Sequence, residues 1–94
     1  MRLEWSAFAI EDRIAIFDYI EAGSPRAAID VDERISNQLS LLILHPESGR
    51  IGRVAGTREL VIANTPYLAA YVIRGETIRI LRILHHAQQW PDQV

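Results

Sequence analysis

Three short apolar segments follow one another in the second half of the chain, and their spacing leaves few folds open. They are Arg58–Ala63, Tyr67–Arg74 and Thr77–His85, each rich in Val, Ile, Leu or Tyr. Turn residues separate them at Asn64-Thr65-Pro66 and at Gly75. Short β-branched runs bounded by turn residues are typical of strands. Because both connections are tight, the segments predict three consecutive antiparallel strands.

Two helices are expected before these strands. Ser6 suits an N-cap, so the first helix should run from Ala7 to Ala22 and stop at Gly23. Ser24-Pro25 then starts a second helix, which should end at about His45 because the next residue is proline. So short a link makes the two helices antiparallel neighbours.

The apolar residues of each helix predict which side faces the core. In the first helix the expected stripe is Ile10, Ile14 and Phe17 with Tyr19 or Ile20, which leaves Asp12 among the residues that face water. In the second helix the core side is formed by apolar residues at spacings of three and four. Those residues are Ala28, Val31, Ile35, Leu39 and Leu42.

The remaining segments complete the fold prediction. A first strand is expected at Arg2–Trp5 and another short one at Arg53–Ala55, after a loop at Glu47–Gly52. The fold class is therefore α+β, with an N-terminal strand and a helical hairpin on one face of a mostly antiparallel sheet of four to five strands. A short C-terminal tail follows, in which Trp90 packs on the body. Residues 1–94 form one domain, and nothing in the chain is left to cover the second face of the sheet.

Composition and charge narrow the kind of protein. There is no Cys, so neither a disulfide framework nor a thiolate site is possible. No apolar run approaches the ~20 residues of a membrane span, and no signal peptide is visible, so we expect a cytoplasmic protein without a membrane partner. Residues 1–47 hold four basic and nine acidic residues, whereas residues 48–94 hold six and three, and every basic residue is Arg. The second half could face nucleic acid or an acidic protein, or simply carry ordinary surface charge.

The last predicted strand carries the residues best suited to proton transfer or phosphate binding. Strict alternation puts Arg79 and His85 on one face and Arg82 and His86 on the other, without indicating which face lies under the helices. Cleavage of a phosphodiester without metal needs proton-transfer groups and cations. His85 or His86, together with Arg58, Arg79 or Arg82, could supply both. Adjacent histidines at a strand end are more often rim residues bonded to backbone carbonyls.

Other patterns carry weaker signals. Tyr67 and Tyr71 lie four apart in one strand and so share a face, where they could stack a nucleobase or pack in the core. No spacing matches a metal motif such as H-E-x-x-H, and there is no Gly-rich phosphate loop. We therefore expect no metal ion and no cofactor.

Several short sequence motifs, spread over nearly the whole chain, together carry a resemblance through their order and spacing. They are Asp12…Ile16…Tyr19-Ile20, Pro25-x-Ala27-Ala28, Leu39…Pro46…Gly49-Arg50, Gly56-Thr57-Arg58-Glu59-Leu60, the strand pair Tyr67–Ile73 and Ile78–Leu84, and Leu84-His85-x-Ala87-Gln88-x-Trp90-Pro91. In this order and spacing the chain resembles toxins of the RelE/ParE superfamily from bacterial type II toxin–antitoxin modules, closest to the ParE/StbE-like branch. The resemblance implies two helices against an antiparallel sheet. It also implies a growth-inhibiting, plasmid-stabilising type of toxin that a cognate antitoxin neutralises.

The resemblance leaves the mechanism divided between two branches. ParE-like members poison DNA gyrase, whereas RelE-like members cleave messenger RNA on the ribosome. RelE-like enzymes place a catalytic Arg in the segment that corresponds to Val61–Pro66, which here has none, and no Tyr follows the last strand. We therefore expect a gyrase inhibitor that is not an enzyme. Its expected target-binding residues are Arg50, Arg58, Arg79, Arg82 and Tyr67.

Two alternatives stay open. The first is a metal-independent endoribonuclease, with ribosome and messenger RNA as partners and His85 or His86 as the catalytic residue. The second is a relative that has lost toxicity and persists as a protein-binding module. The enzyme reading requires a His and at least two Arg to converge on one phosphate-sized site.

Overall fold

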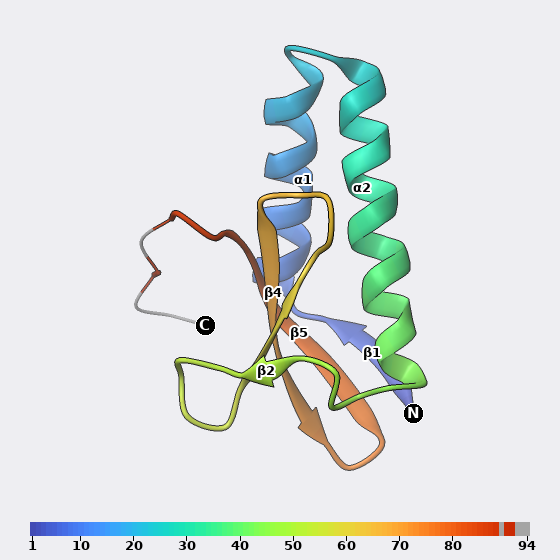
Figure 1. Ribbon diagram of the computed structural model, residues 1–94, viewed down its shortest axis with the longest axis vertical. Coiled ribbons are helices and arrows are strands. Elements are labelled where there is room, and N and C mark those ends of the chain that lie inside the picture. Colours follow the sequence, from blue (N-terminus) through green and yellow to red (C-terminus); the bar gives the residue numbers. More distant parts are fainter. Residues whose placement is uncertain (89, 92–94) are drawn as a thin grey trace.

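A computed structural model describes residues 1–88 and 90–91 and shows a helical hairpin packed on one face of a five-stranded sheet (Figure 1). The helices are α1 (Ala7–Glu21) and α2 (Pro25–Ser40), and the 3₁₀ turn η1 (Leu41–Ile43) extends α2. The strands are β1 (Arg2–Trp5), β2 (Arg50–Ile51), β3 (Arg58–Val61), β4 (Tyr67–Arg74) and β5 (Thr77–His85). Their order is β1-β5-β4-β3-β2, with β1 parallel to β5 and every other pair antiparallel. The expected α+β fold is confirmed.

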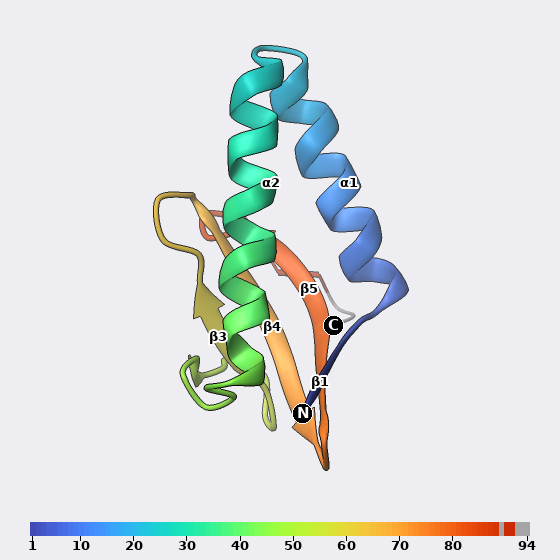
Figure 2. The same cartoon turned by 90° about the vertical axis from the view of Figure 1, so that its right-hand side faces the viewer.

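Serine caps begin both helices. The Ser6 hydroxyl accepts a hydrogen bond from the Ala9 backbone at 3.0 Å, and the Ser24 hydroxyl accepts one from Ala27 at 3.2 Å. Each cap satisfies an amide that has no partner within the helix. The α-helical part of α2 ends at Ser40, earlier than expected, and the 3₁₀ turn carries the chain toward Pro46. Figure 2 shows the tip of the hairpin projecting beyond the sheet.

The core lies between the hairpin and one sheet face, and Tyr71 stands at its centre. Its side chain is fully buried, and its hydroxyl donates to the Pro46 carbonyl at 2.7 Å and accepts from the Gly49 amide at 2.9 Å. A Cβ at Gly49 would lie 2.6 Å from that hydroxyl, so the close approach requires glycine here. Tyr67 belongs to the same core cluster, which confirms that the two tyrosines share a face.

The second short strand is not where the sequence placed it. Strand β2 is Arg50–Ile51, and residues 53–57 form a turn instead of the expected strand Arg53–Ala55. Two interactions explain the turn. The Arg53 backbone N–H donates to the Glu59 carboxylate at 2.8 Å, and the Thr57 hydroxyl donates to the Val54 carbonyl at 2.6 Å.

A β-bulge in β5 changes which side chains share a face. Ala70 lies opposite Arg82 and Tyr71 lies opposite Ile80, so Leu81 has no partner in the register. The extra residue shifts the alternation by one position. Arg79 and Arg82 therefore lie on the same face, and the expectation that they lie on opposite faces is wrong.

The second sheet face is not bare. Leu68, Ala70 and Leu84 are at most 1% exposed, although they alternate with the residues that face the helices. Figure 1 shows the C-terminal tail on the side of β4 away from α2. There the Arg53 guanidinium lies 4.2 Å from the ring centroid of Trp90, which is half-buried. The expectation that nothing covers this face is therefore wrong in part.

Candidate functional site

Asp12 of α1 holds Arg82. The guanidinium donates twice to its carboxylate, from Nε at 2.7 Å and from Nη2 at 2.8 Å, and the two side chains are 14% and 16% exposed. The same carboxylate accepts the Ile83 backbone N–H at 2.9 Å. Hydrogen bonding to Asp12 raises the pKa of Arg82 in spite of the opposing effect of burial. Asp12 therefore does not face water as expected, and Arg82 joins α1 to β5.

Arg79 has a partner on the neighbouring strand. It forms an ion pair with Glu4, which is also its register partner on β1. Both side chains are about two-fifths exposed, at 40% for Arg79 and 43% for Glu4. Exposed pairs of this kind add little stability, so Arg79 is free to exchange Glu4 for another acidic group.

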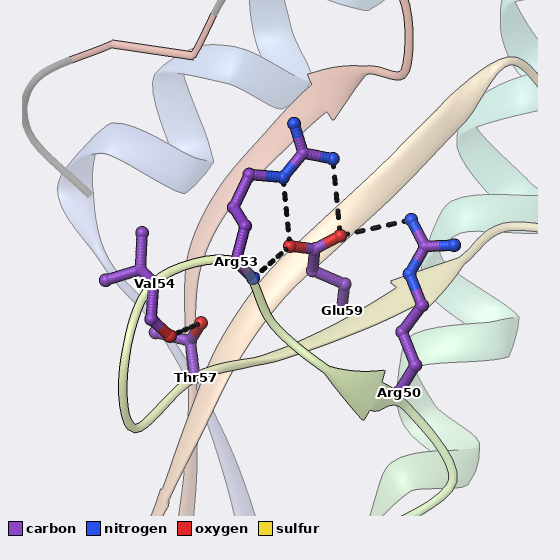
Figure 3. A network of polar contacts seen from close by, with 5 residues as sticks. All are labelled: Arg50, Arg53, Val54, Thr57 and Glu59. Atoms are coloured by element: carbon purple, nitrogen blue, oxygen red, sulfur yellow. Dashed lines mark hydrogen bonds and ion pairs between the residues drawn. The ribbon is translucent and has the colours of Figure 1, made fainter.

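Glu59 gathers Arg50 and Arg53 around one carboxylate (Figure 3). Its side chain is 2% exposed, and it accepts from Arg50 Nη2 at 3.1 Å and from Arg53 Nε at 3.2 Å, besides the Arg53 amide. Burial raises the pKa of Glu59, but the hydrogen bonds from Arg53 and Arg50 outweigh it, so the net pKa is lowered. The one sequence signal for this cluster is a lone acid inside an apolar strand.

Arg58 supports the loop before β2. It lies opposite Tyr71 in the sheet and donates to the carbonyl of Gly49 at 2.8 Å and to that of Glu47 at 3.3 Å. The Arg58 guanidinium, a candidate phosphate-binding group, is thus bound to backbone carbonyls of one loop.

His85, His86 and Tyr67 form an aromatic row at the end of β5. The rings of Tyr67 and His85 meet edge-on with centroids 5.6 Å apart, and those of His85 and His86 stack at 4.9 Å. His86 Nδ1 lies 2.8 Å from the Pro66 carbonyl oxygen, which can only accept, so this nitrogen carries the hydrogen. His85 Nδ1 instead accepts from the Ala87 amide at 3.1 Å. Tyr67 is 8% exposed and its pKa is raised by burial, as expected for a packing residue.

The candidate residues lie at separate places on the sheet. Arg82 stands opposite Ala70, whereas His85 stands opposite Tyr67, so their backbones are about 10 Å apart along the strand. Arg58 is opposite Tyr71, which is about 13 Å along β4 from Tyr67. The structure brings His85, His86 and Tyr67 together. The candidate arginines lie elsewhere, and each of them binds a different acceptor group.

A groove that the sequence did not predict lies beside α1. Its volume is about 450 Å³, and it is lined by Trp5, Ile10, Arg13, Ile14, Phe17 and Asp32. The core side of α1 is formed by Ala9, Ile16 and Ile20. The predicted core stripe is therefore right for Ile20 and wrong for Ile10 and Ile14, which are 48% and 56% exposed.

Two negative findings apply to residues 1–88 and 90–91. No three His, Cys, Asp or Glu side chains group there in a way that could hold a metal ion. Neither helix is long and apolar enough to cross a membrane.

Comparison with protein families identifies the family of this chain. The family model described as the ParE toxin of the type II toxin–antitoxin system parDE matches residues 3–90. The chain belongs to this ParE toxin family.

Individual relatives agree with this membership. The Sinorhizobium fredii protein Y4kP, which is named as a toxin, is 41% identical over 91 residues, covering 97% of this chain and 94% of that protein. Toxin RelE2 of Caulobacter vibrioides is 37% identical over 84 residues, covering 89% and 93%. A chain of the chromosomal ParDE system from P. aeruginosa superposes with a TM-score of 0.81 at 32% identity, covering 90% of this ParE-family chain and 95% of that one.

Proposed function

We propose that this ParE-family toxin arrests growth in the cytoplasm by binding and inhibiting DNA gyrase, and that a cognate antitoxin holds it inactive. Family membership over residues 3–90 supports the toxin role. The similarity to a chain of a ParDE toxin–antitoxin system supports an antitoxin partner.

The occupation of the candidate arginines favours binding over catalysis. A metal-free ribonuclease needs cations that are free to follow the charge that develops on phosphate, beside a group that transfers a proton. Here Arg50, Arg58, Arg79 and Arg82 each hold a separate protein acceptor. The two histidines stand at the strand end with Tyr67. This separation is the observation that carries the proposal.

The exposed arginines are the proposed contacts to the target. Arg50 and Arg79 keep 58% and 40% of their side chains exposed, so they can reach an acidic surface or DNA phosphate without unfolding any element. Tyr67 and Arg82 are mostly buried, and we assign them to packing and to the joint between α1 and β5. Arg58 is half-buried on backbone carbonyls, and we assign it to supporting the loop before β2.

Two assays on the purified toxin test this proposal, namely gyrase supercoiling and cleavage of messenger RNA on translating ribosomes. We expect supercoiling to be inhibited and the RNA to stay intact. The double variant Arg50→Ala/Arg79→Ala should lose most of the inhibition, whereas Arg26→Ala, an exposed change on α2, should retain it. RNA cleavage without inhibition of gyrase would overturn the proposal. His86 would then be the next residue to change, because its Nε2 carries no hydrogen in the neutral ring and could accept a proton.

A further inference from the structure

Arg50 and Arg53 keep hydrogen-bond donors for a ligand on the side of the sheet away from the helices. Within the described residues, Arg50 bonds Glu59 through Nη2, and Arg53 does so through Nε and Nη2, the latter at 3.4 Å. Nη1 of each guanidinium has no acceptor within residues 1–88 and 90–91, and Figure 3 shows it pointing away from the carboxylate. Because the two side chains are 58% and 46% exposed, these donors can reach an anion in solvent.

We propose that Arg50 and Arg53 form a binding site for the phosphate groups of duplex DNA, in which Glu59 is a positioning residue. A guanidinium presents a planar fork of N–H donors that matches two phosphate oxygens. Binding of this kind needs no proton-transfer group, so it fits a toxin that holds DNA without cutting it. The proposal deepens the proposed function and rests on it for the setting, a gyrase that works on duplex DNA.

Glu59 fixes the two arginines in the free toxin. Its carboxylate is 2% exposed and also accepts the Arg53 amide at 2.8 Å, so the backbone and the guanidinium of Arg53 are tied to one buried group. Its lowered pKa keeps this carboxylate charged at neutral pH. The Trp90 ring, 4.2 Å from the Arg53 guanidinium, restricts the plane of that group. Side chains held in this way lose little freedom on binding a ligand, and two guanidinium charges against one carboxylate leave the site positive.

Basic side chains recur across this side of the sheet. Three successive rows of the strand register hold arginine: the first is Arg82, Ala70, Glu59 and Arg50, the second Glu4, Arg79 and Val72, and the third Arg2, Thr77 and Arg74. With Arg53 and with Asp12, which binds Arg82, these rows carry six arginines against three acidic residues. Positive charge spread over three rows suits a polyanion with phosphates at regular intervals. Duplex DNA therefore fits this side better than a single acidic patch of a protein.

Affinity for a fluorescein-labelled DNA duplex, measured by fluorescence anisotropy without gyrase, tests the site. Arg50→Lys/Arg53→Lys keeps both charges but loses the planar forks, so we expect the affinity to fall by about tenfold. Arg26→Lys makes the same exchange at an exposed position of α2 and should leave the affinity within about twofold. Wild-type affinity in the double variant would overturn the proposal.

Removal of the Glu59 charge separates positioning from net charge. Glu59→Gln makes the toxin more positive by one charge, so attraction through charge alone would strengthen DNA binding. If Glu59 positions the two arginines, the variant should instead bind at least about fivefold more weakly. Glu76→Gln makes the same change of charge at an 89% exposed side chain, and its affinity should equal or exceed that of the wild type.

The Glu59 comparison is read on protein that circular dichroism shows to be folded. Glu59→Gln that binds DNA as tightly as Glu76→Gln would overturn the positioning role. The lysine variants change only exposed side chains, so they test the site even if Glu59→Gln is too unstable to measure.

Salt dependence provides an independent readout. The logarithm of the affinity should fall linearly with the logarithm of the salt concentration, and Arg50→Ala/Arg53→Ala should make this slope shallower by about two, one for each lost phosphate contact. Inhibition of supercoiling by a toxin that binds no DNA would overturn this proposal alone and assign the arginines to an acidic protein surface. DNA binding without inhibition of supercoiling would overturn the proposed function and leave the phosphate site in place.

Discussion

Asp12 accepts three hydrogen bonds from β5, two from the Arg82 guanidinium and one from the Ile83 amide. Replacing Arg82 by Ala leaves this carboxylate, which is 16% exposed, with the amide alone. We therefore expect Arg82→Ala to lower the free energy of unfolding by about 2 kcal/mol, the size of a lost charge-assisted hydrogen bond. Urea denaturation measures the change.

Arg79→Ala is the matched control for this change. It removes an arginine from the same face of β5, but its pair with Glu4 is partly exposed and should contribute less than about 1 kcal/mol. Equal losses in the two variants would contradict the larger contribution expected of the contact with Asp12.

A second residue-scale prediction concerns pH and Glu59. Its pKa is lowered from the ordinary value of 4.5 in the folded chain, so its contacts stabilise the fold above that value and are lost as pH falls through the lower, folded pKa. Glu59→Gln should therefore lower the free energy of unfolding by about 2 kcal/mol at pH 7. The difference from wild type should shrink progressively as the pH falls below 4.5.

Denaturation curves at several pH values test this, with Glu76→Gln as the control. Glu76 has an 89% exposed side chain, so its variant should track the wild type throughout. A constant difference between Glu59→Gln and wild type from pH 7 to pH 3 would contradict a carboxylate-specific role.

At the scale of elements, tight turns made the strands predictable. The predicted bounds of β1, β4 and β5 agree with the structure. Those of β4 and β5 follow from Gly75 and Asn64-Thr65-Pro66, which fix where the chain can reverse. Helix α1 was located correctly, but its buried side was predicted correctly only at Ile20. Apolar residues lie nearly all round it, so periodicity alone could not choose between the row of Ile10 and that of Ala9.

The candidate site was less predictable because two of its determinants are tertiary. The bulge at Leu81 leaves no mark in a strand of alternating Ile, Leu and Arg, yet it decides which arginines share a face. Likewise, the sequence correctly predicts Glu59 within a strand, but the arginines that bind it lie six and nine positions earlier in the chain. Charge pairing over such distances depends on the fold and cannot be read from local spacing.

At the scale of the whole molecule, Glu59 links three regions through Arg53. The carboxylate lies on β3, Arg53 lies in the turn after β2, and the Arg53 guanidinium stacks on Trp90 of the C-terminal tail. Through this chain of contacts one buried acid orders the turn and the tail on the side of the sheet away from the helices. The tail is therefore tied to the sheet by a cation–π contact of about 0.5–1 kcal/mol.

Fluorescence quenching of Trp90 tests that link in a Trp5→Phe background, which leaves Trp90 as the one tryptophan of the chain. Arg53→Ala should make Trp90 more accessible to acrylamide and shift its emission to the red, because the ring loses the guanidinium that covers it. Arg50→Ala is the control, since Arg50 bonds the same Glu59 carboxylate and should leave the quenching constant unchanged. If both variants quench alike, the tail depends on the charge of the cluster and not on the stack. If neither differs from its parent, Arg53 does not hold the tail.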